Sequence, residues 1–356
     1  MIVGTVLEFA AVDTQPLAAL DTMEGYRRLF TDVGLWSPFV ETVLRKHDLE
    51  PRGPVRLGIP GTCPAFAVGE RWVVKFFGRL FDGGRSFATE REAARLTALD
   101  PRIRAVPAAA VGTLGGAGWP WPYLVFPFIK GTSIGAAAGS LPYAARLTMA
   151  AELGEMIRRL HALPVGGSPV FANTHAAYRQ FLEEQRAGLT ERLRAWGSLP
   201  ERLIEAAEVF VPVPDALMDL DRPPHLIHAD LTGDHLLGEV VGSGQDSAWH
   251  TNALIDFGDA RTGDLLYELG PLQLDLFGGD RGLLGAFLDA YGLPPARREA
   301  LPEQALATAL LHQFDLFGGY AEEARAAADL ADLADLAQRL FGAPVSREED
   351  RPARRA

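Results

Sequence analysis

The 356-residue sequence is poor in cysteine, in lysine and in long apolar runs, and each shortage excludes a class of protein. Its single cysteine, Cys63, rules out an internal disulfide and any metal site built from several cysteines. No uninterrupted apolar run reaches the roughly 18 residues typical of a membrane span. The first segment lacks a basic region and carries Glu8 and Asp13, which is not typical of a secretory signal. We therefore expect a soluble cytoplasmic protein.

The charge balance is acidic and excludes another group of partners. Lysine and arginine total 34 against 46 aspartates and glutamates, which gives a net charge of -12. Such a surface does not favour nonspecific binding to nucleic acid or to an anionic membrane, whereas cationic small molecules are favoured. The hydrophobic share of 48% suffices for a sizeable core, and the length predicts about two domains. The oligomeric state is left open.

Periodicity divides the chain into a β-rich part and a mostly helical part. Residues 21–47 recur at helical spacing, residues 55–77 contain β-rich runs separated by glycine turns, and residues 86–100 return to helical spacing. The run YLVFPFIKG is strand-like, but Pro127 argues against a central strand and favours a strand that ends in a connector.

We place the domain boundary at that proline, which gives a first domain of residues 1–127 and a second of residues 128–356. Helical spacing dominates the second domain, and two short strand-like pieces, HLIH and NALIDFG, interrupt it.

Two acid-bearing loops in the second domain carry the strongest chemical signal. The segment LIHADLTGDHLL places His228, Asp230 and His235 in H-x-D-x4-H spacing, and ALIDFGDARTGD contains Asp256. Phosphoryl transfer from a nucleotide needs a carboxylate beside the attacking hydroxyl and ligands for a divalent cation. The pattern matches a kinase catalytic loop with His instead of the usual Asn, followed by a DFG-type element. We predict Asp230 and His228 as the catalytic pair, with His228 organising the loop, and His235 and Asp256 as ligands of Mg²⁺ or Mn²⁺.

The second constellation lies in the first domain. Lys75, one of three lysines, stands inside the apolar strand WVVKFF, where an ammonium group needs a partner. Donor phosphates and a helix glutamate would provide one; we predict Glu92, with Glu90 as the alternative. Neither G-x-G-x-x-G nor the Walker A pattern is present, but the amides of Gly61 and Thr62 could cradle phosphates, unless this segment is a plain turn.

Taken together, Lys75 and Glu92, the connector PYLVFPFIKG, the helix ending in RRLH, and the HADLTGDHLL and IDFGDARTGD loops resemble the aminoglycoside phosphotransferase family. The resemblance covers roughly residues 30–345. Within the family, WPWPYLV, VVKFFG and LHQFDLF are similar to hygromycin B phosphotransferases, which modify the 7''-hydroxyl. Three positions depart from the family pattern: Ala229 replaces Gly, His235 replaces Asn as in macrolide phosphotransferases, and Glu268 replaces Asp.

The resemblance implies an α+β, bilobal, protein-kinase-like fold, with an antiparallel sheet in a small N-lobe and a larger, mainly helical C-lobe. It also implies ATP or GTP as phosphoryl donor, Mg²⁺, and an antibiotic hydroxyl as acceptor. We assign Phe126 and Phe128 of the connector to nucleotide binding. For a cationic acceptor we assign Asp259, Asp315 and Glu322, which could equally form a solvated acidic face.

Two alternatives to an aminoglycoside kinase stay open. The first is a kinase of a cellular metabolite or of a macrolide, and phosphorylation of such a compound with aminoglycosides inert would identify it. The second is a nucleotide-binding pseudokinase, which the departure at His235 favours. Metal-dependent nucleotide binding without transfer would identify that case.

Overall fold

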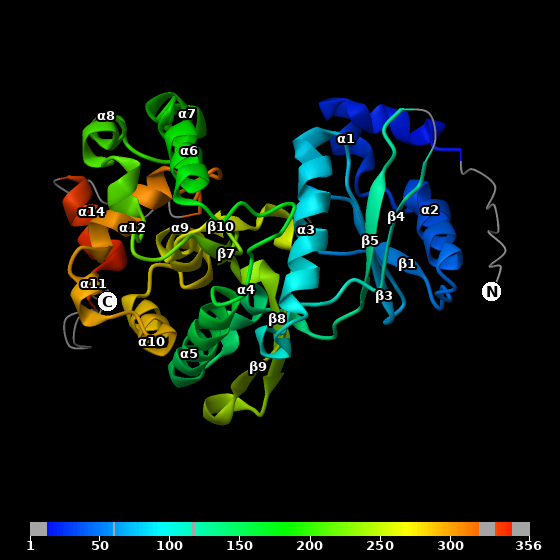
Figure 1. The fold of residues 1–356 in the computed structure, drawn as a ribbon. Helices are drawn as coiled ribbons and strands as arrows, with labels where there is room; N and C mark the ends of the chain where they lie inside the picture. The colour runs from blue at the N-terminus through cyan, green and yellow to red at the C-terminus, as the bar shows by residue number, and fades with distance from the viewer. Residues whose placement is uncertain (1–12, 60, 116–117, 320–331, 344–356) are drawn as a thin grey trace, which may run out of the picture. The chain divides into compact units, whose positions relative to one another are not determined.

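The chain folds into two compact units (Figure 1). The computed structural model describes residues 13–59, 61–115, 118–319 and 332–343. One unit comprises the described residues up to Ala98 together with Ala105–Lys130; the other comprises Leu99–Arg104 and the described residues from Gly131 onward. Glu322, one of the predicted acceptor residues, lies outside the described residues.

The first unit is built on a five-stranded antiparallel sheet with strand order β1-β2-β3-β5-β4. Its strands are β1 (Val55–Leu57), β2 (Ala65–Val68), β3 (Trp72–Phe76), β4 (Ala110–Thr113) and β5 (Pro122–Pro127). The strand β5 is central, which corrects the expectation drawn from Pro127. Both of its prolines stand at its ends, so the four residues between them keep the N–H groups that a central strand needs.

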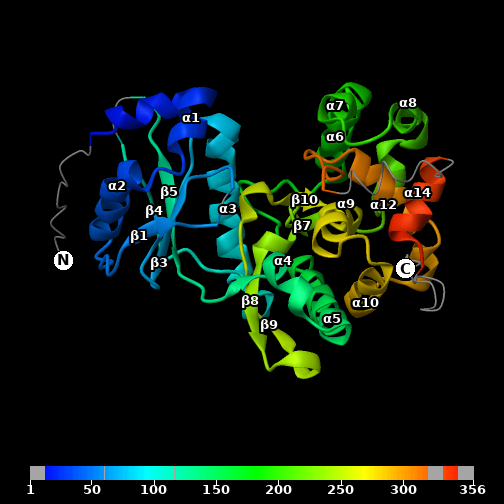
Figure 2. The ribbon, with the colours of Figure 1, turned by 180° about the vertical axis from the view of Figure 1, so that it is seen from behind.

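Helices cover both faces of this sheet, and they are α1 (Met23–Leu29), α2 (Val33–Lys46) and α3 (Gly83–Thr97). Figures 1 and 2 show α2 and α3 on opposite faces. The Asp32 side chain caps α2 by accepting from the Leu35 N–H at 3.1 Å. The apolar stripe of α2, including Trp36 and Val40, packs with Val74 and Phe76 of β3 in one core. Because side chains alternate along a strand, Lys75 lies on the other face, towards α3.

The second unit is mainly helical and contains two small antiparallel sheets, one of order β6-β8-β9 and one that pairs β7 with β10. Its strands are β6 (Thr132–Ser133), β7 (His225–Ile227), β8 (Leu236–Val241), β9 (Ala248–Leu254) and β10 (Arg261–Gly263). Its helices are α4 (Ile134–Ala137), α5 (Tyr143–Leu160), α6 (His175–Arg186), α7 (Leu189–Trp196), α8 (Glu201–Phe210), α9 (Leu265–Pro271), α10 (Arg281–Tyr291), α11 (Pro295–Arg298), α12 (Leu301–Leu310) and α14 (Leu333–Phe341).

Two long helices of this unit, α5 and α10, pack side by side (Figures 1 and 2). A Cβ added at Gly154 of α5 would lie 2.3 Å from the carbonyl oxygen of Phe287 in α10. A glycine is therefore required for the two backbones to approach this closely. In the small sheets of this unit, β7 and β9 each end directly before one of the two acid-bearing loops.

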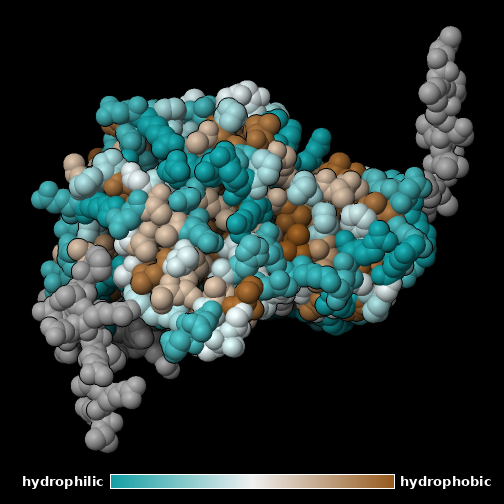
Figure 3. Space-filling model, turned by 90° about the horizontal axis from the view of Figure 1, so that it is seen from below, coloured by the Kyte–Doolittle hydropathy of each residue, from teal (hydrophilic) through white to brown (hydrophobic). Residues whose placement is uncertain are grey.

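Hydrophobic and hydrophilic residues are mixed on the surface of the molecule. On the face in Figure 3, hydrophobic residues are interspersed among hydrophilic ones, which is ordinary for a folded protein. Val209 is the most exposed large hydrophobic residue among those described, at 91%. Within the described ranges, no helix combines the length and apolar character that crossing a bilayer requires.

Candidate functional site

The segment between β7 and β8 holds Asp230, and the segment between β9 and β10 holds Asp256. The two sheets fix both segments, because β10 pairs with β7 and β8 pairs with β9. The backbone joins the segments directly, since the Ile255 N–H donates to the His235 carbonyl at 3.0 Å. Residues 26 positions apart in sequence, Asp230 and Asp256, are thereby brought into one cluster, as the motif spacing predicted.

His228 connects the same two segments from the buried side. Its side chain is fully buried, and its Nε2 atom lies 2.9 Å from the Ile255 carbonyl oxygen, which can only accept. Burial, together with the nearby His235, lowers the pKa of His228 to about 4. The imidazole is therefore neutral near pH 7 and donates a structural hydrogen bond. This position fits the expected loop-organising role.

Asp230 is a poorly solvated carboxylate among other carboxylates. Burial, and to a lesser extent the negative charges of Asp259, Asp256 and Asp275, raise its pKa to about 7 against the opposing effect of His235. A carboxyl group with a pKa near neutrality is well matched to accepting a proton at that pH.

One ring nitrogen of His235 forms a hydrogen bond within the loop that carries it. Its Nδ1 atom lies 2.7 Å from the Asp230 carbonyl oxygen, so Nδ1 carries the proton and donates. The other nitrogen, Nε2, lies 3.9 Å from Oδ2 of Asp256. Asp256 has a left-handed backbone (φ 63°), and its Oδ1 accepts the Gly258 N–H at 3.4 Å, which turns Oδ2 towards His235.

This donor set fits a divalent cation that also binds phosphates. An imidazole nitrogen and a carboxylate oxygen are both ordinary ligands of Mn²⁺, and the carboxylate suits Mg²⁺. In the part of the chain that the structure describes, no group of three or more such side chains is gathered into a complete metal cage. Mg²⁺ at nucleotide sites is commonly held by one or two carboxylates plus substrate phosphates. Two protein ligands, His235 and Asp256, would therefore be enough if the donor phosphates supply the others.

Two further carboxylates hold the Asp230 segment; sequence analysis noted Glu268 only as a departure from the family pattern and missed Asp275. Glu268 of α9 is fully buried and accepts the N–H groups of His228 and Ala229, the latter at 3.1 Å. Asp275 accepts the Gly233 N–H at 2.7 Å. Their partners lie about 40 residues away in sequence, so periodicity offered no signal for them; only the Asp-to-Glu departure drew attention to Glu268.

Of the two predicted acceptor residues that the structure describes, Asp259 lies with the Asp230 cluster and Asp315 bonds elsewhere. Asp259 accepts from the Gln313 side chain at 3.0 Å, and its charge acts on Asp230. Asp315 accepts from the Ser198 hydroxyl, in the segment between α7 and α8, and from the Phe317 N–H.

In the first unit, Lys75 forms an ion pair with Glu90, and Glu92 forms one with Arg95. The Lys75 Nζ atom lies 2.8 Å from Oε2 of Glu90, and both side chains are almost completely buried. Glu92 instead accepts two hydrogen bonds from Arg95, at 2.7 and 2.8 Å. Residues two apart on a helix point to different sides, so only one of the two glutamates can face β3. The observed ion pair involves Glu90, the alternative partner, and a role of Glu92 at the nucleotide stays a prediction.

This pairing predicts unequal effects for two matched variants. Glu90→Gln leaves the buried Lys75 ammonium without its anion and should lower the free energy of unfolding by about 3–5 kcal/mol. Glu92→Gln removes an ion pair whose Arg95 is 59% exposed, and should cost at most about 1 kcal/mol. Chemical denaturation of both variants measures the difference. Equal losses would contradict the assignment of Glu90.

The remaining predicted nucleotide-binding residues lie at the ends of strands. Gly61 and Thr62 are exposed in the connection between β1 and β2, and the Tyr26 hydroxyl donates to the Thr62 carbonyl. A Cβ placed on Gly61 would meet nothing within 4 Å, so its backbone is open to approach. Phe126 is the penultimate residue of β5 and is half-buried, and the Phe128 ring lies 4.9 Å from the Arg56 guanidinium.

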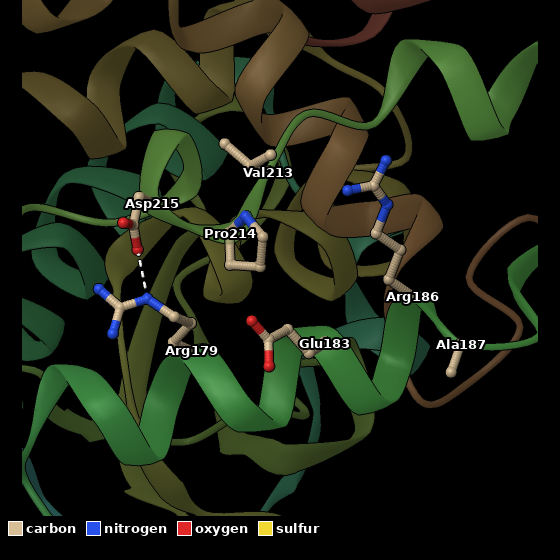
Figure 4. Close-up of a pocket in the computed structure, with 7 residues that line it drawn as sticks. All are labelled: Arg179, Glu183, Arg186, Ala187, Val213, Pro214 and Asp215. Carbon is tan, nitrogen blue, oxygen red and sulfur yellow. Dashed lines mark hydrogen bonds and ion pairs between the residues drawn. The ribbon is translucent and has the colours of Figure 1, made fainter.

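A separate surface pocket of about 430 Å³ lies beside α6 (Figure 4). Arg179, Glu183 and Arg186 of α6 line it, and Arg179 pairs with Asp215 at 2.6 Å across it. None of the predicted site residues lines this pocket. Its charges are mixed, so it lacks the acidic character of the Asp230 cluster.

The two units and the loop geometry define a mixed α+β fold of the kinase-like class. A model of the phosphotransferase enzyme family matches residues 64–302, and the chain belongs to this family. The GDP and kanamycin complex of APH(2")-IIia is similar in fold, with a TM-score of 0.60 and 19% identity over 82% of this chain and 99% of that one. The GDP complex of wild-type aminoglycoside 2'-phosphotransferase-IIIa gives a TM-score of 0.59 at 19% identity, over 87% and 97% of the two chains.

A curated relative matches a smaller part. Lysine-specific demethylase JMJ21 of Arabidopsis thaliana is 28% identical over 208 residues, which are 50% of this chain and 22% of that protein. The chain thus spans about a fifth of the length of this relative. The demethylase activity in its name is a property of that protein.

Proposed function

We propose that the protein transfers the γ-phosphoryl group of ATP or GTP to a hydroxyl of a cationic small molecule, an aminoglycoside of the hygromycin B type. The observation that carries the proposal is the half-buried Asp230 carboxylate, with its raised pKa, beside the pair His235 and Asp256. The family membership supports the reaction class. The similar structures bear the names of complexes with GDP and kanamycin, which supports a nucleotide and an aminoglycoside as partners.

In this mechanism Asp230 accepts the proton of the acceptor hydroxyl as its oxygen bonds to phosphorus and the bond to the nucleoside diphosphate breaks. Lys75, held by Glu90, binds the phosphates of the donor. His235 and Asp256 would hold a divalent cation, which would supply positive charge to neutralise the donor phosphates. The net charge of -12 and Asp259 favour a polycationic acceptor.

The substrate class is tested by acceptor-dependent release of ADP or GDP. The purified protein receives each nucleotide with Mg²⁺ or Mn²⁺ and, in turn, hygromycin B, kanamycin, a macrolide and a small amino alcohol. We expect release with hygromycin B above the level seen without acceptor. Release with only the macrolide or the amino alcohol would transfer the proposal to those classes, and nucleotide binding without any release would indicate a pseudokinase.

The histidine ligand predicts an altered metal preference. His235→Asn replaces the imidazole nitrogen by an amide oxygen, so affinity for Mn²⁺ should fall roughly tenfold or more while Mg²⁺ is retained or improved. Calorimetric titration of Mn²⁺ into the nucleotide-bound protein measures this directly, and the ratio of the Mn²⁺ to Mg²⁺ rates should fall with it. His250→Asn, at an exposed histidine of β9, is the control. An unchanged Mn²⁺ affinity in His235→Asn would remove His235 from the ligand set.

A further inference from the structure

His312 joins the end of α12 to the Asp230 segment, 83 residues earlier in the chain. Its side chain is fully buried, and its Nε2 atom lies 3.1 Å from the carbonyl oxygen of Ala229. His312 lies in the LHQFDLF motif, and the mechanism proposed above gives this histidine no role. The histidine nevertheless contacts the residue that directly precedes Asp230.

The hydrogen bonds of His312 fix its tautomer. The Phe314 N–H donates to Nδ1 at 3.2 Å, so Nδ1 holds a lone pair and the proton lies on Nε2. Nε2 therefore donates to the Ala229 carbonyl. The Tyr267 ring stacks on the imidazole with centroids 4.5 Å apart, which fixes the plane of the ring. Burial lowers the pKa of His312 to about 3, so this neutral form persists at ordinary pH.

Ala229 is a residue that needs to be held. Its φ of 65° is left-handed, a conformation that costs a residue with a Cβ about 1–2 kcal/mol. Glu268 holds the N–H of Ala229, and His312 holds its carbonyl group. The carbonyl of Ala229 belongs to the peptide plane whose nitrogen is that of Asp230. The orientation of this plane sets the direction in which the Asp230 side chain leaves the backbone.

The residues that follow His312 contact the neighbouring parts of the cluster. Gln313 donates to Asp259 at 3.0 Å, and the Tyr267 hydroxyl accepts the Gln313 N–H at 3.2 Å. The segment 312–315 is thus tied to the Asp230 segment, to the Asp256 segment and to α9. These hydrogen bonds fix the position of the segment 312–315, and therefore the position from which His312 donates to the Ala229 carbonyl.

We propose that His312 is a positioning residue for Asp230, acting through the Nε2–H hydrogen bond to the Ala229 carbonyl. This inference rests on the proposed catalytic role of Asp230. Because a displacement of about 1 Å costs about 10²-fold in rate, loss of this bond should lower kcat by up to about 10²-fold. KM for the nucleotide should stay within about threefold, since His312 makes no substrate contact.

Two amide variants separate the effect of the His312–Ala229 hydrogen bond from the effect of the ring packing against Tyr267. In His312→Gln the side-chain amide reaches the place of Nε2 and can donate to Ala229, whereas in His312→Asn it reaches only the place of Nδ1. Both remove the ring that stacks on Tyr267, so both should lose similar stability in chemical denaturation. We expect His312→Gln to keep most of the wild-type kcat and His312→Asn to lose it. Equal kcat values in the two variants would overturn the proposal.

Amide hydrogen exchange provides a readout that needs no acceptor. Exchange at residues 228–232 should accelerate in His312→Asn and stay near wild type in His312→Gln. Unchanged exchange in both variants would overturn the positioning role whatever the activity. Exchange that changes as expected would support the positioning role of His312 even if the wild-type protein transfers no phosphoryl group. That lack of transfer would overturn the proposed function instead.

Discussion

Asp230→Asn should lower kcat by about 10²–10⁴-fold, the usual contribution of a positioned general base. Asparagine matches the size of aspartate and keeps the backbone bonds of the segment, but it cannot take up the hydroxyl proton at neutral pH. KM for the nucleotide should change little, because Asp230 contacts the acceptor side of the reaction in our mechanism. Steady-state rates with the best acceptor, at saturating nucleotide, measure the effect.

Asp234 offers a matched control for this variant. It lies four residues further along the same segment, is exposed, and accepts from the Ser133 hydroxyl at 3.1 Å. Asp234→Asn removes the same charge from the same loop and should leave kcat within about twofold, as for an ordinary surface change. If both variants lose activity equally, the loss reports on loop charge and not on a base at position 230.

Lys75→Met should lower kcat/KM for the nucleotide by about 10²–10³-fold, as expected for removal of one group that stabilises transition-state charge. The change keeps the apolar stem in β3 and deletes the ammonium group. It also leaves Glu90 buried without its cation, which should cost about 3–5 kcal/mol of folding free energy. Initial rates over a range of nucleotide concentrations measure the catalytic part.

The double variant Lys75→Met with Glu90→Gln separates catalysis from stability. It removes both charges of the Lys75–Glu90 pair, so most of the lost stability should return while the rate stays low. Lys46→Met, at the exposed end of α2, is the control for losing one lysine. Recovery of the rate together with the stability would show that Lys75 is structural.

Local patterns predicted much of the fold. The helical spacing of residues 21–47 anticipated α1 and α2, and the apolar piece around Leu226 anticipated β7. The strand β8 was missed because Gly238 and Glu239, residue types that are rare in strands, interrupt its apolar pattern. The assignment of Leu99–Arg104 to the second unit could not be predicted, because it depends on the bond from the Leu254 N–H to Arg104.

Some features of the candidate site were also predictable from the sequence, and others were not. The proximity of Asp230, His235 and Asp256 was predictable because the two motifs place those residue types at the spacing that is typical of phosphoryl transfer. The choice between Glu90 and Glu92 was not, since it depends on how α3 is rotated above the sheet. Glu268 and His312 hold backbone groups of residues about 40 and 83 positions away, and such contacts form only in the folded chain. The candidate reacting groups are thus easier to identify from a sequence pattern than the groups that support them.

The positive φ of Ala229 connects these observations. Glycine adopts this conformation without a steric cost, whereas alanine is held there by bonds on both sides of its peptide. The substitution of Gly by Ala in the motif is therefore compatible with an ordered loop. The supporting bonds explain how the departure from the family pattern is accommodated.

The most direct test of the central claim follows the phosphorus atom. The protein is incubated with hygromycin B and with ATP or GTP labelled at the γ-phosphate, with Mg²⁺ present, and the products are separated beside an Asp230→Asn sample. We predict label on the antibiotic with the wild-type protein and almost none with the variant. Label that stays on the nucleotide, or that reaches the antibiotic equally in both samples, would contradict the account.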